Sequence, residues 1–231
     1  MILYSIGDSV TWGAELDNKE EERYSKLVAN HLDAIDCNNA SAGVSNDYLF
    51  RNTMRDVHQW INTHKIWDET NGWSKSDELK VLIGWTSPTR FEWWNGNNYQ
   101  QERLWYGYDK WGDIDEFKTT EDRFILHQNE LIPSYIRTFN HIQSLVSLCE
   151  LNKIDYYFFN TFYQYEEINE PKSKIDLWGR YDEQLGLDYL KVDMDNMYDF
   201  LNNNNATFHQ RKHPTKESHK MWADYIIKKW L

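Results

Sequence analysis

The chain is poor in cysteine and proline, and it has no segment that separates one part from another. It holds two cysteines, four prolines and ten glycines among 231 residues. Cys37 and Cys149 lack the C-x-x-C spacing of a redox or zinc site, so we expect two buried free thiols. No stretch rich in Pro, Gly or Ser and no block of one charge marks a linker. We therefore expect a single domain over residues 1–231.

Long apolar runs and an excess of basic residues are also missing. No window approaches the roughly 18 apolar residues of a membrane span, and the first residues lack the basic and apolar regions of a signal peptide. We therefore expect a cytoplasmic protein without a membrane partner. With 25 basic against 37 acidic residues, the formal net charge is -12. A surface of this sign repels a phosphate backbone, which argues against nucleic acid as a partner.

Apolar residues make up 40% of the chain, and their spacing alternates between strand and helix patterns. This alternation predicts a three-layer α/β/α domain with a flavodoxin-like parallel sheet of about five strands. Pro133 is expected to start or kink a helix. The strands are expected at 2–6, 34–38, 79–85 and 154–162, and the helices at 22–32, 48–61, 124–151 and 217–230.

An aromatic-rich insertion is expected at about 92–120. Trp and Tyr side chains are spread there among Asn, Gln and Gly. Aromatic faces stack on sugar rings and amide side chains bond hydroxyls, so this segment could form a rim that holds a saccharide. Packing under a long loop and a protein interface are the alternatives. Its many charged residues do not suit the apolar entrance of a lipase.

Ser9 is the candidate nucleophile. A serine hydroxyl needs a base to take its proton and donors for the oxyanion that develops. The strand 2–6 delivers Ser9 to the carboxyl edge of the sheet, where open α/β folds place their sites. Gly7 permits the turn, and Gly13 permits close approach of the following chain. An ordinary turn containing Asp and Ser fits the same residues.

His213 is the candidate base, because it precedes Pro214 and a predicted helix and so also lies at an edge of the sheet. His209, His219 and Glu217 are close to it in sequence and could suggest a metal site. Their spacing matches no zinc motif, however, and we expect no metal and no other cofactor.

Three segments together resemble the sequence blocks of the SGNH/GDSL hydrolases. Residues 7–13, Gly-Asp-Ser-Val-Thr-Trp-Gly, resemble the first block, and residues 39–45, Asn-Ala-Ser-Ala-Gly-Val-Ser, resemble the second. Residues 213–219, His-Pro-Thr-Lys-Glu-Ser-His, resemble the last. The resemblance implies that Ser9 is the nucleophile, that His213 is the base and that His219 is structural. It also implies that the amides of Ser9 and Gly43 line an oxyanion hole.

Two positions depart from the family pattern. The third block usually carries an Asn that donates to the oxyanion, and Thr86 stands at that position. A hydroxyl can still donate one hydrogen bond, whereas loss of such a donor typically costs about 100- to 1000-fold in rate. The triad acid usually lies three residues before the histidine, and Gln210 stands there. Ser9 and His213 then act as a dyad, or a carbonyl or carboxylate from another loop orients the imidazole.

Three further residues are candidate substrate contacts: Asp8, Trp12 and Arg90. Arg90 belongs to a variant third block that resembles one met in some virus-associated relatives. It either pairs with Glu92 to brace its loop or binds an anionic group of the substrate.

These features favour a serine esterase that acts on small polar or sugar esters, with removal of acetyl groups from carbohydrate as the preferred reaction. A catalytically weak or inactive binding or structural protein on the same fold is the alternative, because Thr86 and Gln210 replace supporting residues. Acyl transfer to an alcohol would use the same residues as hydrolysis.

Overall fold

A central sheet of four parallel strands organises the molecule. The computed structural model describes residues 1–68, 71–87, 90–94, 99–103, 137–161 and 194–231. The strands follow the order β2-β1-β5-β8, and neighbours pair in parallel. Their bounds are Ile35–Asn38 for β2, Ile2–Ile6 for β1, Leu79–Trp85 for β5 and Asp155–Asn160 for β8.

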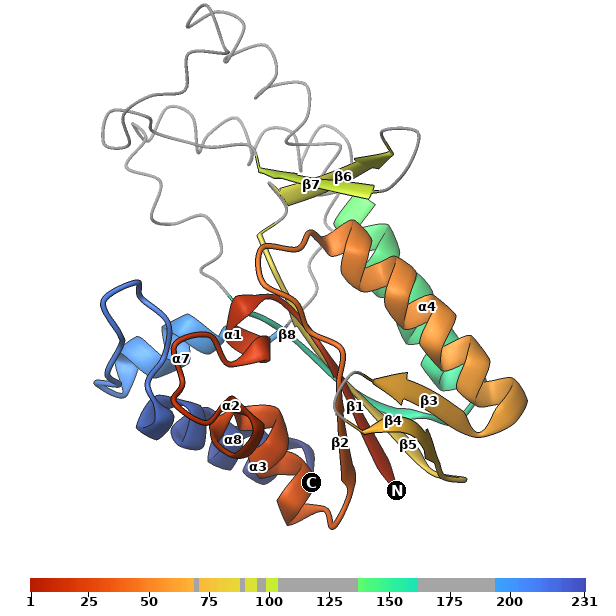
Figure 1. Cartoon of the computed structure of the whole chain (residues 1–231), viewed down its shortest axis with the longest axis horizontal. Helices are drawn as coiled ribbons and strands as arrows, with labels where there is room; N and C mark the ends of the chain where they lie inside the picture. Colours follow the sequence, from red (N-terminus) through yellow and green to blue (C-terminus); the bar gives the residue numbers. More distant parts are fainter. Residues whose placement is uncertain (69–70, 88–89, 95–98, 104–136, 162–193) are drawn as a thin grey trace, which may run out of the picture.

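Helices cover both faces of the sheet (Figure 1). One face carries α4 (Asn46–Thr63) and the helical residues 137–151, and the other carries α3 (Tyr24–His31) and α8 (Lys216–Trp230). Alternate strand residues point to opposite faces, so a strand in the middle of the sheet contributes to two apolar cores. In β1, Ile2, Tyr4 and Ile6 join the first core and Leu3 joins the second. The predicted three-layer α/β/α class is confirmed.

Beside β8, where a fifth strand of the sheet would lie, the structure has a single isolated β-bridge. Asn196 pairs in parallel with Asn160 at the end of β8, immediately before α7 (Met197–Asn203). In this sheet the described residues thus supply four strands and one bridge, against the predicted number of about five strands.

Several short elements were not expected from the sequence. A two-stranded hairpin, β3 (Lys65–Asp68) and β4 (Gly72–Lys75), follows α4, and two four-residue helices follow β1. These helices are α1 (Ser9–Trp12) and α2 (Lys19–Glu22). The two helices are too short to show a helical period, which needs a window of about 11 residues or more, and the two strands of the hairpin lack a continuous apolar run.

The predicted insertion begins as an antiparallel hairpin of β6 (Arg90–Trp94) and β7 (Tyr99–Arg103). Most of the aromatic segment and the first half of the helix predicted at 124–151 lie outside the described residues. Both cysteines are free and buried, as predicted. Among the helices of the described ranges, none is long and apolar enough to cross a membrane.

The carboxyl ends of β1 and β5 lie at one edge of the sheet. β1 leads directly into α1 and β5 into residues 86–87, at the end of the molecule from which β6 and β7 project (Figure 1). The two loops therefore meet where an open parallel sheet places its site.

Candidate active site

Ser9 is the first residue of the single-turn helix α1. Asp8 caps this helix, since its side chain accepts the Val10 N–H at 3.0 Å. Gly13 ends the turn in the left-handed region at φ 86°, which favours glycine. A Cβ on Gly7 would lie 2.0 Å from Thr11 Oγ1, so only glycine lets β1 pass into α1 at this distance. These residues present Ser9 at the sheet edge, as the sequence predicts.

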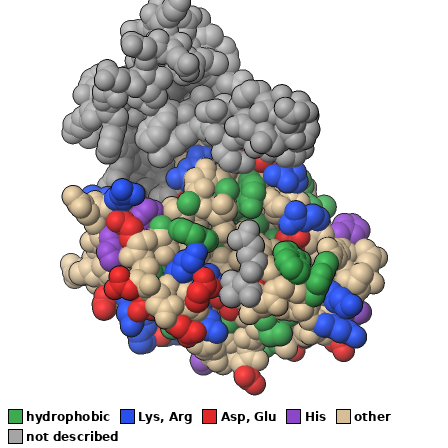
Figure 2. All heavy atoms as spheres, viewed as in Figure 1, with side chains coloured by type: hydrophobic (Ala, Val, Ile, Leu, Met, Phe, Trp, Pro, Cys, Tyr) green, Lys and Arg blue, Asp and Glu red, His purple; other side chains and the backbone are tan. Residues whose placement is uncertain are grey.

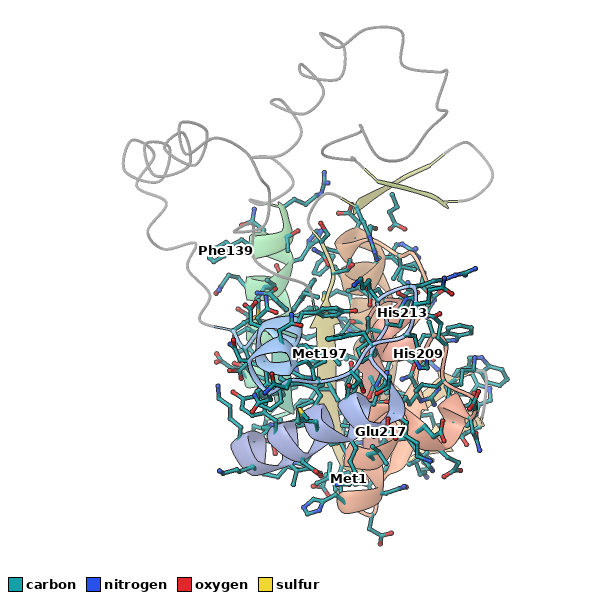
Figure 3. All side chains as sticks on the ribbon, turned by 90° about the vertical axis from the view of Figure 1, so that its left-hand side faces the viewer. Met1, Phe139, Met197, His209, His213 and Glu217 are labelled. Atoms are coloured by element: carbon teal, nitrogen blue, oxygen red, sulfur yellow. The ribbon has the colours of Figure 1, made fainter. Side chains whose placement is uncertain are left out.

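His213 reaches Ser9 from the other end of the chain. It lies on the loop between α7 and α8, together with His209 (Figure 3). The His209 N–H donates to the His213 carbonyl oxygen at 2.8 Å, and this bond closes the turn that aims the imidazole. His213 Nε2 lies 3.0 Å from Ser9 Oγ. The two residues predicted to act together are therefore within hydrogen-bond distance.

The other nitrogen of His213 contacts a carboxylate. Nδ1 lies 2.6 Å from Oε2 of Glu15, whose side chain is 26% exposed. Because a carboxylate accepts, Nδ1 carries the proton and Nε2 is free to accept one from Ser9. The hydrogen bond from His213 lowers the pKa of Glu15 below its usual value. Glu15 is thus the acidic partner of the histidine, and Gln210, which is exposed, is not needed for that role.

Sequence reasoning missed Glu15. Its backbone has φ 66°, in the left-handed region that residues with a side chain rarely adopt. This conformation turns the chain after Gly13, and no sequence pattern marks it. The only available signal was an acidic residue in the short loop after the nucleophile's turn.

Gly43 lies on the loop between β2 and α4, alongside the turn before Ser9. The Ser41 N–H donates to the Gly7 carbonyl oxygen at 3.1 Å, which ties the two loops together. Gly43 has φ 78°, and nothing lies within 4 Å of the place where a Cβ would stand. Space is therefore open beside the Cα of Gly43, whose amide the resemblance assigns to the oxyanion hole.

Thr86 has a different hydrogen-bond partner from the one expected. Its hydroxyl donates to Asp8 Oδ2 at 3.0 Å, and its backbone N–H donates to the Asn46 side chain at 2.9 Å. The Asn46 amide in turn donates to the Thr86 carbonyl oxygen at 3.0 Å. The single hydroxyl proton is thus used inside the protein, and a role for Thr86 as oxyanion donor does not fit this geometry.

Arg90 pairs with Asp8 and not with Glu92. Its Nη1 donates to Asp8 Oδ2 at 3.1 Å, whereas Glu92 accepts two bonds from Arg51 at 2.9 and 3.1 Å. The Arg90–Glu92 pair, one of the two alternatives for Arg90, is therefore not supported by these contacts. Asp8 is fully buried, so the expectation that it contacts substrate is also not supported. The sequence spacing could not show that a carboxylate beside Ser9 needs a cation of its own.

Trp12 is exposed close to Ser9, as a substrate contact requires. Its relative exposure is 37%, and Lys19 Nζ lies 3.5 Å from the centre of its ring. One face of the indole thus carries an ammonium group.

His219 lies in the core and not in the site. Its Nδ1 accepts the Tyr24 N–H at 3.2 Å, and burial lowers the pKa of His219 to about 3. This environment suits the structural role that the resemblance implies. Within the described part of the chain, no three His, Cys, Asp or Glu side chains are grouped as metal ligands would be.

The chain is similar to several solved structures. Esterase EstA from Pseudoalteromonas sp., inhibited by monoethylphosphonate, is 14% identical, with a TM-score of 0.50 over 99% of this chain and 97% of that one. A protein assigned to the lipolytic G-D-S-L family, from Desulfitobacterium hafniense DCB-2, is also 14% identical, with a TM-score of 0.49 over 98% and 97%. A carbohydrate esterase family 2 enzyme from Corynascus thermopiles is 12% identical, with a TM-score of 0.46 over 98% and 64%.

No family model matches the chain, and no curated protein matches it. The fold and the site together define an α/β/α domain with a serine, a histidine and a carboxylate in line at the carboxyl edge of its sheet. This fold is the one that esterase EstA has.

Proposed function

We propose that the protein is a serine ester hydrolase in which Ser9, His213 and Glu15 form the catalytic triad. The observation that carries the proposal is the chain of two contacts, 3.0 Å from Ser9 Oγ to His213 Nε2 and 2.6 Å from His213 Nδ1 to Glu15. Nucleophile, base and orienting acid are the three roles that acyl transfer through serine requires.

The reaction proceeds in two halves. Ser9 Oγ attacks the acyl carbon while its proton passes to His213 Nε2, and the carbonyl oxygen becomes an oxyanion near the amides of Ser9 and Gly43. Collapse of this intermediate breaks the ester C–O bond, and His213 returns the proton to the leaving alcohol. Water then attacks the acyl-enzyme with His213 again as base, which releases the acid and restores Ser9.

Glu15 has two tasks in both halves. Its carboxylate holds the tautomer in which Nε2 is free to accept a proton, and it stabilises the imidazolium that forms. The hydrogen bond from His213 lowers the pKa of Glu15, which favours the ionised carboxylate that this role needs. The alternative of a binding protein without turnover rests in part on Gln210, which stands where the family has the triad acid. Because Glu15 fills that role in the proposal, Gln210 does not argue for an inactive site.

The surroundings of Ser9 favour a polar substrate. The exposed indole of Trp12 lies beside Lys19, and Glu15 is partly exposed on the other side of His213. Figure 2 shows histidine, acidic and basic side chains next to one another over α7 and the loop that follows it. We propose small polar esters as substrates, with acetylated sugars preferred because an indole face can stack on a sugar ring.

Hydrolysis assays test this function. We expect 4-nitrophenyl acetate and an acetylated oligosaccharide to be hydrolysed by the wild type, and Ser9→Ala to remove both activities while the thermal unfolding midpoint is kept. Activity on the aryl ester alone would restrict the proposal to small esters. Equal rates for the wild type and Ser9→Ala would contradict it.

A further inference from the structure

The carboxylate of Asp8 is the most deeply buried charge beside the nucleophile. It is fully buried, with Oδ1 on the Val10 N–H and Oδ2 accepting from both Thr86 Oγ1 and Arg90 Nη1. A buried carboxylate without a cation is costly, and a negative charge next to Ser9 would oppose the oxyanion that catalysis must stabilise. Arg90 is the cation that contacts Asp8 here.

The same nitrogen of Arg90 also faces the second loop of the oxyanion hole. Nη1 lies 3.4 Å from the carbonyl oxygen of Val44, the residue after Gly43. The guanidinium group therefore stands between the residue before Ser9 and the residue after Gly43. These are the two segments whose backbone amides are proposed to hold the oxyanion. The Arg90 side chain is only 10% exposed, so water screens its charge weakly.

Thr86 cannot replace Arg90 in this arrangement. Its hydroxyl proton is donated to Asp8, and Asn46 holds its backbone at both the N–H and the carbonyl oxygen. The position where SGNH/GDSL hydrolases usually have an amide donor is thus occupied by a side chain that braces Asp8. The nearest positive charge along the same loop is Arg90.

We infer that Arg90 is the positioning residue of the oxyanion hole. Its positive charge neutralises Asp8, so the electrostatic potential at the developing oxyanion is not made unfavourable by that carboxylate. Its contacts also hold the loops of Ser9 and Gly43 at a fixed separation, so that the two backbone amides converge on the oxyanion. This inference rests on the proposed esterase function. It also replaces the expectation that Arg90 binds an anionic substrate, since its guanidinium group is already paired with a buried carboxylate.

The test uses Arg90→Gln, Arg90→Lys and Arg51→Gln with 4-nitrophenyl acetate. Arg51 is the matched control, because it anchors the same loop through Glu92 without contacting Asp8. We expect Arg90→Gln to lower kcat by about 10- to 100-fold, with little change in KM. This is less than the roughly 100- to 1000-fold loss that follows removal of a direct oxyanion donor, because Arg90 acts through the two amides and does not itself contact the oxyanion. Arg90→Lys should recover part of kcat, and Arg51→Gln should keep it.

A double variant separates charge neutralisation from packing. If Arg90 acts by neutralising Asp8, then Asp8→Asn in the Arg90→Gln background should raise kcat above that of Arg90→Gln alone. Two packing defects would instead lower it further. A second measurement is independent of turnover. Arg90→Gln should lower the midpoint of urea unfolding, and adding Asp8→Asn should restore part of it.

The outcomes distinguish this inference from the function on which it rests. An active wild type with an unchanged kcat in Arg90→Gln, or with a raised KM alone, overturns the role of Arg90 and leaves the esterase proposal standing. Equal losses of kcat in Arg90→Gln and Arg51→Gln reduce Arg90 to a loop anchor and overturn the inference as well. A wild type without ester hydrolysis and without modification of Ser9 by a phosphonate removes both.

Discussion

Replacing Glu15 with Gln is the sharpest test of the proposed triad. The amide keeps the length and shape of the side chain but removes the negative charge that faces His213 Nδ1 at 2.6 Å. An amide can also donate to Nδ1, which favours the tautomer with the proton on Nε2. In that tautomer, His213 cannot take the proton of Ser9.

The expected size of the effect follows from the exposure of Glu15. In the serine protease template, replacing a buried triad Asp with Asn lowers kcat by about 10⁴-fold. The side chain of Glu15 is 26% exposed, so water screens its charge and can substitute for part of its field. We therefore expect Glu15→Gln to lower kcat by about 10²- to 10³-fold, with KM nearly unchanged because Glu15 does not touch the acyl group.

The assay compares initial rates on 4-nitrophenyl acetate for the wild type, Glu15→Gln and Gln210→Ala. Gln210 is the matched control, because it stands where the family pattern places the acid and its side chain is exposed. Gln210→Ala should keep the wild-type kcat. A normal kcat in Glu15→Gln would refute the triad, and a large loss in Gln210→Ala would place the orienting group elsewhere.

Three more predictions concern stability and the oxyanion hole. Gly7→Ala should lower the free energy of unfolding by about 1–3 kcal/mol or more, measured by urea denaturation, because the new Cβ would meet Thr11 Oγ1 at 2.0 Å. An unchanged stability would mean that α1 can shift freely. Gly43→Ala should lower the free energy of unfolding by only about 1–2 kcal/mol, because alanine disfavours the left-handed φ of this residue. It should also lower kcat, because the backbone amide would point in a different direction. An unchanged kcat would contradict a role for Gly43 in the oxyanion hole. Burial lowers the pKa of His219 to about 3, so below about pH 6.5 the unfolded chain binds a proton that the folded chain does not. The wild type should then lose up to about 1.4 kcal/mol per pH unit between pH 6.5 and pH 3. His219→Gln should lose less over the same range, and identical pH dependence in the two proteins would contradict the assignment.

The fold could be predicted from the sequence because its strands are short, apolar and separated by helical patterns. β1 was expected at residues 2–6 and lies at Ile2–Ile6, and β5 was expected at 79–85 and lies at Leu79–Trp85. Burial on both faces makes such strands continuous apolar runs, which are easy to recognise. The hairpin of β3 and β4 is exposed on one side and has no comparable run, so its residues gave no signal.

The candidate site was only partly predictable, for a different reason. Ser9 and His213 lie in motifs, and the structure brings them together at 3.0 Å. Glu15, Arg90 and Asp8 act through contacts between loops that lie next to each other only after folding. The partner of Thr86 was equally hidden, because a hydroxyl at that position can donate either to a substrate or to Asp8, and only the geometry decides between them.

Covalent modification of Ser9 tests the central claim most directly. A fluorophosphonate should phosphonylate Ser9 Oγ and release fluoride, and mass mapping of the digested protein should place the added mass on the peptide that contains Ser9. Ser9→Ala should remain unmodified, and Glu15→Gln should react more slowly than the wild type. No adduct on the folded wild type at high reagent concentration, or an adduct that persists in Ser9→Ala, would contradict the assignment of Ser9 as the nucleophile.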